Sequence, residues 1–262
     1  MTAGLQLTPA AAFRSGALGW RPRVSYAAHL AKAALRQHHR ELLPVLRPLI
    51  PDDGVVFDVG GHAGQFAKLF AGLTPRGRVY AFEPGGYARS ILTRVVRFRR
   101  LRNVTVVPMG LGDAAGAAVL YMPVKASGSY GFGLSHLGSG ETGRRQRDER
   151  IGLTTIDAFC DQRALHRLDF IKADIEGWEL RMLVGGGRAI ARFRPVILLE
   201  VSAAHLARAG DTVADLWAFL EKLGYRPTPL ATAVNGFAAA ARHGAGDLLW
   251  LPEGHAMRKY LE

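Results

Sequence analysis

The spacing of hydrophobic and polar positions predicts an amphipathic helix near the start of the chain, over residues 25–49. Apolar side chains recur there at roughly helical intervals, at Ala27, Leu30, Ala34, Leu35, Leu42 and Leu46. Pro44 and Pro48 are expected to kink or end the helix. Its other face is basic, which suits packing on its own domain or peripheral contact with a membrane. Residues 1–20 show no clear period and are expected to be poorly ordered.

From Val55 onward the pattern alternates between short apolar runs and helical spacing. The wholly apolar run Val55–Phe57 is typical of a strand covered on both faces. Repeated βα units of this length predict an α/β fold with a doubly wound, mostly parallel sheet. The predicted strands are 55–57, 78–82, 104–107, 169–173, 195–201, 225–230 and 247–251, and the predicted helices are 65–73, 87–98, 178–184 and 212–223.

The alternation breaks in the middle of the chain, where strands are predicted at 117–124 and 152–155. Between them lies the glycine- and serine-rich stretch 127–143. A long loop of this kind inside a compact domain is usually functional or disordered, and we predict a mobile lid over the binding site. We divide the chain into an N-terminal extension, residues 1–50, and one α/β domain, residues 51–262.

Composition narrows the compartment and the partners. The only cysteine, Cys160, excludes an internal disulfide and suits a reducing compartment. The sequence shows neither a signal peptide nor a run long enough to cross a membrane, so a cytoplasmic location is expected. The net charge of +12 comes mainly from arginines clustered at 14–47, 89–102 and 144–150. Anionic partners are conceivable on this charge, but solvated side chains are the simpler interpretation, and no nucleic acid is expected.

A glycine-rich turn after the first strand carries the first chemical signal. The segment Asp58–Gly64 opens a helix but lacks the G-x-G-x-x-G pattern of dinucleotide sites. Asp58 would repel a pyrophosphate and suits a ligand with a cationic tail. Glu83 ends the second strand, where a carboxylate can accept hydrogen bonds from ribose hydroxyls. Together the two acids predict S-adenosyl-L-methionine as cofactor, against the alternative of a helix cap and an unrelated surface glutamate.

These motifs resemble those of the FkbM-type methyltransferases over residues 55–201, in order and in spacing. The matching segments are 56–65, 82–84, 103–113, 170–179, which carries the lysine, aspartate, glutamate and glycine signature, and 195–201, which contains Glu200. Gly61 and Trp178 depart from the family pattern. The resemblance implies a Rossmann-like class I methyltransferase that uses S-adenosyl-L-methionine. The predicted cofactor-binding residues are Asp58, Gly60, Gly61, His62, Gly64, Glu83, Pro84, Gly110 and Asp174.

The signature segment also supplies the candidate catalytic residues. Lys172, Asp174 and Glu176 occupy alternate positions, and on an extended strand end they would share one face. Methyl transfer to a hydroxyl needs positioning and removal of a proton. Asp174 or Glu176 is the expected base, Lys172 would orient the acids, and His205 is a second candidate base. No spacing of metal ligands is evident, so no metal is predicted, although two acids near an acceptor could hold Mg²⁺.

The sequence therefore predicts an O-methyltransferase with an N-terminal helical extension. The resemblance implies a hydroxyl acceptor on a glycan, a glycolipid or a natural product. Two alternatives stay open, a nicotinamide-dependent oxidoreductase built on the same sheet and an RNA-binding protein or RNA methyltransferase suggested by the charge. The sequence decides neither the acceptor, nor the oligomeric state, nor whether the basic helix touches a membrane.

Overall fold

The computed structural model describes residues 20–123, 136–137, 146–228 and 246–256. A seven-stranded sheet forms its centre, in the order β10-β11-β9-β8-β1-β2-β3. Strand β11 runs opposite to the other six strands, which confirms the mostly parallel sheet. The bounds are β1 (Val55–Val59), β2 (Arg78–Phe82), β3 (Val104–Val107), β8 (Phe170–Ala173), β9 (Val196–Val201), β10 (Tyr225–Thr228) and β11 (Gly246–Pro252).

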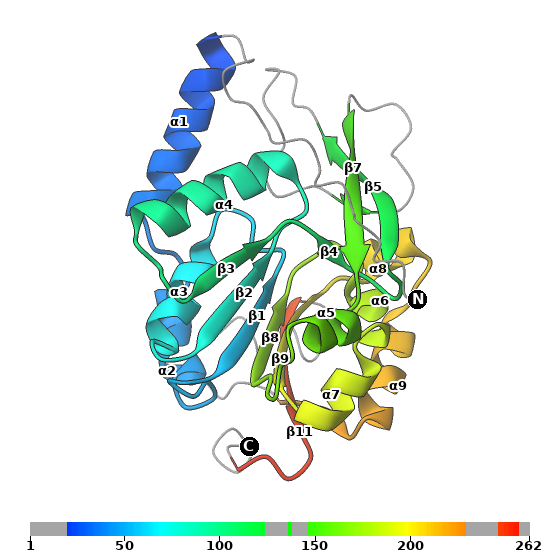
Figure 1. The fold of residues 1–262 in the computed structure, drawn as a ribbon. Coiled ribbons are helices and arrows are strands. Elements are labelled where there is room, and N and C mark those ends of the chain that lie inside the picture. Colours follow the sequence, from blue (N-terminus) through cyan, green and yellow to red (C-terminus); the bar gives the residue numbers. More distant parts are fainter. Residues whose placement is uncertain (1–19, 124–135, 138–145, 229–245, 257–262) are drawn as a thin grey trace, which may run out of the picture.

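Helices cover both faces of this sheet (Figure 1). Adjacent strand residues point into different apolar clusters: Val56 packs with Phe70 on one face, and Phe57 packs with Phe159 on the other. This alternation explains why the strand sequences are continuously apolar, because neither face meets water. The helices are α3 (Gln65–Leu73), α4 (Gly86–Phe98), α5 (Ile156–Gln162), α6 (Glu179–Val184), α7 (Gly187–Phe193), α8 (Ala203–Ala209) and α9 (Val213–Lys222).

A second, four-stranded sheet stands at one end of the first (Figure 1), in the order β4-β7-β5-β6. It accounts for the break in the βα pattern and extends further than predicted, because β7 begins at Gln146 rather than at residue 152. Its strands are β4 (Gly110–Leu111), β5 (Gly116–Pro123), β6 (His136–Leu137) and β7 (Gln146–Thr154). Apart from β6, the stretch predicted to be a lid lies outside the described residues, as do residues 1–19.

The N-terminal extension differs from the single helix that was predicted. It forms α1 (Trp20–Leu35), a 3₁₀ turn η2 (Arg40–Leu42) and α2 (Leu43–Leu46), so the break precedes both prolines. Lys68 donates hydrogen bonds of 2.6 Å to the carbonyl oxygens of Ala33 and Arg36, which satisfies acceptors that a continuing helix would use itself. His39 then adopts a left-handed conformation, with φ 63°. In the described part of the chain, each helix is too short or too polar to cross a bilayer.

Candidate active site

A cavity of about 310 Å³ lies at the carboxyl ends of the central strands, where ligands bind in open α/β sheets. The turn after β1, the end of β2 and the segment after β8 line its polar side. Strands β4 and β5 of the small sheet contribute apolar side chains to its wall. The cavity thus gathers nine of the predicted site residues: Gly60, Gly61, His62, Glu83, Pro84, Gly110, Lys172, Asp174 and Glu176.

The glycine turn brings backbone close to the cavity and to the catalytic segment. Gly60 has φ 75°, and a Cβ atom there would lie 2.1 Å from the carbonyl oxygen of Asp174. Only glycine therefore lets the turn pack directly on the segment after β8. The amides of Gly60 and Gly61 donate to the carbonyl oxygen of Phe82, at 3.1 and 2.9 Å. These bonds join the turn to the end of β2.

Glu83 links the turn to helix α4. Its Oε2 accepts a 2.8 Å hydrogen bond from the amide of His62, and its Oε1 accepts one of 2.9 Å from the amide of Gly85. Burial raises the pKa of Glu83 to about 7, despite these two bonds. Burial also lowers the pKa of His62 to about 4, so its imidazole is neutral at physiological pH. The carboxyl group of Glu83 is thus fixed in place and lines the cavity.

Two predicted ligand residues lie beneath the cavity wall rather than in it. Asp58 is fully buried and sits opposite Lys172 in the pairing of β1 with β8. Burial raises the pKa of Asp58 to about 6, while the Lys172 ammonium opposes this increase. Gly64, with φ 82°, packs against Leu92 of α4 and starts helix α3. Both residues support the turn from behind.

Lys172 and Asp174 form an ion pair in the cavity wall, in which Lys172 is buried and Asp174 is partly exposed. Lys172 Nζ lies 3.4 Å from Asp174 Oδ2 and 4.8 Å from the centre of the Phe66 ring. Burial lowers the pKa of Lys172, but the Asp174 and Asp58 carboxylates outweigh it, so the pKa rises. The Lys172 charge in turn lowers the pKa of Asp174 to about 2. Asp174 is therefore an electrostatic partner of Lys172 and a weak proton acceptor.

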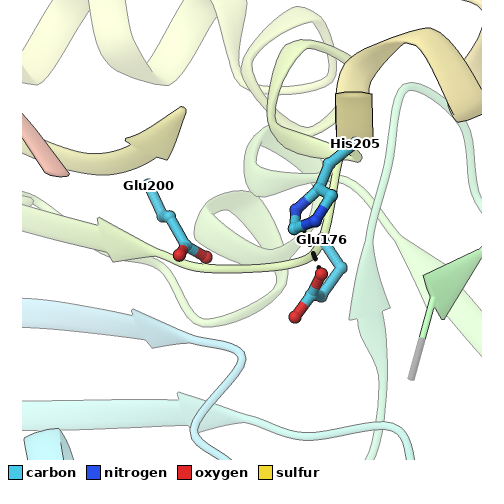
Figure 2. A group of neighbouring side chains, drawn as sticks. All are labelled: Glu176, Glu200 and His205. Carbon is cyan, nitrogen blue, oxygen red and sulfur yellow. Dashed lines mark ion pairs between the residues drawn. The ribbon is translucent and has the colours of Figure 1, made fainter. Parts of the chain in front are cut away.

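Glu176 does not continue the face that Lys172 and Asp174 share. Strand β8 ends at Ala173, and Glu176 is left-handed, with φ 57°, so the chain turns away before reaching it. Its carboxylate instead meets helix α8: Oε2 lies 3.0 Å from His205 Nδ1 and 3.6 Å from an Arg208 nitrogen. Figure 2 shows the dashed contact between Glu176 and His205. The alternate spacing therefore does not extend to Glu176, although Glu176 still lines the cavity, and its carboxylate contacts His205, the other candidate base.

The turn that carries Glu176 is held by a buried acid. Glu179 is 1% exposed, and its Oε1 accepts hydrogen bonds from the amides of Ile175 and Gly177, at 3.0 and 3.4 Å. Gly177 has φ 107°, and a Cβ atom there would lie 2.1 Å from the carbonyl oxygen of His205. This close approach, available only to glycine, brings the Glu176 turn against the start of α8.

Glu200, at the end of β9, is a site residue that the sequence indicated only through the family resemblance. Its carboxyl group hydrogen-bonds Asp174, which together with burial raises the pKa of Glu200 to about 8. Figure 2 shows Glu200 facing Glu176 and His205, and one donor atom from each of the three lies within 4.8 Å of the others. These are metal-ligating residue types, but Glu176 and His205 already pair with each other, and the absence of a metal stays a prediction.

The apolar wall and the extension also supply side chains to the cavity. Leu120 and Met122 of β5 line the cavity, although β5 carries no recognisable motif. Trp178 also lines it and packs on the small sheet, with the Arg181 guanidinium 4.7 Å from its ring centre. His39 reaches the cavity from the extension and stacks on Phe66, with ring centres 4.6 Å apart. Of these residues the sequence had indicated only Trp178, as a departure from the family pattern.

Known proteins match this chain over most of the region just described. Residues 58–227 match the family described as the methyltransferase FkbM domain. The chain is 29% identical over 200 residues to the AMB antimetabolite synthetase AmbE of Pseudomonas aeruginosa, covering 64% of this chain and 9% of AmbE. It is 25% identical over 169 residues to the 2-O-methyltransferase NoeI of Sinorhizobium fredii, covering 60% of this chain and 65% of NoeI. It therefore spans less than two thirds of either relative.

A solved structure supports the same fold. The methyltransferase FkbM from Methylobacillus flagellatus superposes with a TM-score of 0.50 at 18% identity, covering 87% of this chain and 59% of that one. The family match spans the glycine turn, Glu83 and the segment after β8, which line the cavity, and it also contains Glu200. The chain therefore belongs to the FkbM methyltransferase family and has a Rossmann-like fold.

Proposed function

We propose that this protein transfers a methyl group from S-adenosyl-L-methionine to a hydroxyl oxygen of a glycan, a glycolipid or a natural product. The observation that carries the proposal is the glycine turn hydrogen-bonded to Glu83 at the wall of the cavity. Gly60 and Gly61 line the cavity, and their hydrogen bonds to Phe82 fix the turn against which the methionine part of the donor would lie. The fixed Glu83 carboxylate suits the two ribose hydroxyls. NoeI, a 2-O-methyltransferase by name, supports oxygen as the acceptor atom.

The donor supplies an electrophilic methyl group when bound, and the chain must position the acceptor and take its proton. Glu176 and His205 suit the second task. Burial raises the pKa of Glu176, and the nearby Asp174 carboxylate raises it further, so Glu176 is a better proton acceptor than Asp174. His205 Nδ1, 3.0 Å away, orients that carboxylate. The Lys172–Asp174 ion pair lies between the Glu176–His205 pair and the glycine turn, and it sets the local charge there.

The nicotinamide alternative is disfavoured by the family match and by the turn itself, which lacks a dinucleotide fingerprint. The test has two stages. Calorimetry should detect binding of S-adenosylmethionine and S-adenosylhomocysteine but not of NAD. Incubation with a methyl-labelled donor and a panel of hydroxylated sugars, glycolipids and polyketides, followed by mass spectrometry, should then find a labelled ether. Binding of NAD without S-adenosylhomocysteine would overturn the proposal.

A further inference from the structure

Four arginines crowd into the turn between α4 and β3, at the edge of the sheet opposite the cavity. Residues 97–102 read Arg-Phe-Arg-Arg-Leu-Arg, and we call this segment the basic turn. All four arginines are exposed, and the phenyl ring of Phe98 between them is 66% exposed. Neither the donor site nor the acceptor chemistry uses any of these side chains.

A groove of about 550 Å³ adjoins the basic turn and adds further positive charge. Arg100 and Arg102 line it together with Lys68 and Arg78, and no described lining residue is acidic. The acids closest along the chain are engaged elsewhere: Glu83 lines the cavity, and Asp113 lies 3.7 Å from an Arg181 nitrogen.

Within the described residues, therefore, no carboxylate neutralises the basic turn. Lys68 also senses the positive charge of the basic turn. Burial and, to a smaller extent, the charge of Arg99 together lower its pKa to about 8. Cations held this close repel one another, and the repulsion is relieved when an anionic surface meets them.

We propose that the basic turn docks on an anionic phospholipid surface, with Phe98 entering the interfacial layer between its flanking arginines. Arginine side chains can keep their charge among headgroups while their stems lie on apolar material. An aromatic ring prefers the same interfacial depth. Single-stranded nucleic acid is the weaker match, because it needs several aromatic platforms in succession and the turn offers one.

The position of the basic turn determines how a docked molecule is oriented on the membrane. Because β3 begins just after the turn, the turn lies at the amino ends of the strands, whereas the cavity opens at their carboxyl ends. A docked molecule therefore keeps its cavity facing away from the bilayer. The basic turn is a tether and not a route by which a lipid enters the active site, so the proposal stands independently of the acceptor.

The test is sedimentation of the full chain with vesicles of phosphatidylcholine alone and with about 30 mol% phosphatidylglycerol. We expect binding only to the anionic vesicles, weakening as salt rises. The triple variant Arg97→Gln, Arg99→Gln, Arg100→Gln should lose roughly a hundredfold in partitioning, at roughly fivefold for each arginine. Phe98→Ser should weaken binding but leave its salt dependence.

The matched control replaces three exposed arginines elsewhere, Arg150, Arg163 and Arg192, with glutamine. It should bind vesicles like the parent, and all variants should keep the parent's thermal unfolding and S-adenosylhomocysteine affinity. If the control and the triple variant lost vesicle partitioning equally, binding would depend only on net charge, and the proposal would be overturned. Failure of the parent to bind anionic vesicles would overturn it too, as would tighter binding to a single-stranded RNA that the triple variant loses.

Discussion

Glu83 is the single side chain on which donor recognition most depends. Glu83→Gln keeps the shape of the side chain, but an NH₂ group, which donates hydrogen bonds, replaces one of the oxygens that would accept from the ribose hydroxyls. The loss should cost about 1.5–3 kcal/mol, or roughly tenfold to a hundredfold in S-adenosylhomocysteine affinity measured by calorimetry. Glu149→Gln is the control, because Glu149 also accepts from a backbone amide of α4, at Gly86, yet does not line the cavity. Equal affinity in the parent and Glu83→Gln would refute the ribose assignment.

The raised pKa of Glu83 makes the same interaction depend on pH. With a pKa of about 7, Glu83 is largely protonated in mildly acidic solution and accepts hydrogen bonds less well. Affinity for S-adenosylhomocysteine should therefore rise as pH increases through about 7, by up to about tenfold for each pH unit below that value. His62, with a pKa of about 4, stays neutral over this window and adds no opposing trend. Titrations at several pH values should show the slope in the parent and its loss in Glu83→Gln.

Substitutions at Glu176 and Asp174 should distinguish the removal of the acceptor's proton from electrostatic support of the site. Glu176→Gln keeps the turn but removes the base, and a positioned base contributes about 10²–10⁴-fold. Once an acceptor is known, this variant should bind S-adenosylhomocysteine nearly as the parent does and lose most of its kcat. Asp174→Asn leaves Lys172 without its partner at 3.4 Å and should affect donor binding as well as turnover. Parental turnover in both variants would place the base elsewhere, with His205 the next candidate.

At the scale of elements, the turn between β8 and α6 depends on Glu179. Burial raises the pKa of this carboxyl to about 7, so the folded state keeps a proton that the unfolded state releases above about pH 4.5. The contribution of the protonated group to stability is complete below that pH and is lost as pH rises through about 7. Glu179→Gln stays neutral throughout, and its Oε1 still accepts from Ile175 and Gly177.

Urea unfolding of the parent and of Glu179→Gln should therefore diverge with pH. The stability of the variant relative to the parent should increase between about pH 4.5 and pH 7, by at most about 1.4 kcal/mol in free energy of unfolding for each pH unit. Glu221→Gln, at an exposed ion pair with Arg226, is the control and should show no such gain. A constant difference between parent and variant would mean that Glu179 is ionised in the folded protein.

The strands and turns also show which parts of the fold and of the site could be predicted from the sequence. Strands such as β1 were predictable because both of their faces are buried, so they contain apolar runs such as Val55–Phe57. The cavity residues of β1, β2 and β8 followed, since parallel strands end at one edge. The position of Glu176 was not predictable, because a left-handed residue after β8 breaks the alternation that placed it. His39 was equally hidden: a break stabilised by Lys68, which is distant in sequence, brings it to the cavity.

At the scale of the whole molecule, the extension and the family domain share their hydrophobic cores. The family match begins at residue 58, yet Leu42, Leu46, Leu49 and Ile50 are at most 5% exposed and pack with strand and helix residues of the sheet. Helix α1 contributes less to this core. Its Tyr26 and Ala33 pack on α4 in a smaller cluster. The boundary that matters for folding therefore lies within the extension, between α1 and α2.

Two truncations test this division. A chain starting at residue 36 lacks α1 but keeps α2, and we expect it to fold with reduced stability. A chain starting at residue 51 loses four further buried side chains, each contributing about 1.5–3 kcal/mol. Their sum of roughly 6–12 kcal/mol rivals the total stability of a typical domain, so this chain should not fold cooperatively. Circular dichroism during urea unfolding distinguishes the outcomes, with a chain starting at residue 20 as the reference. A cooperative transition in residues 51–262 would show that the sheet and its helices suffice without α2.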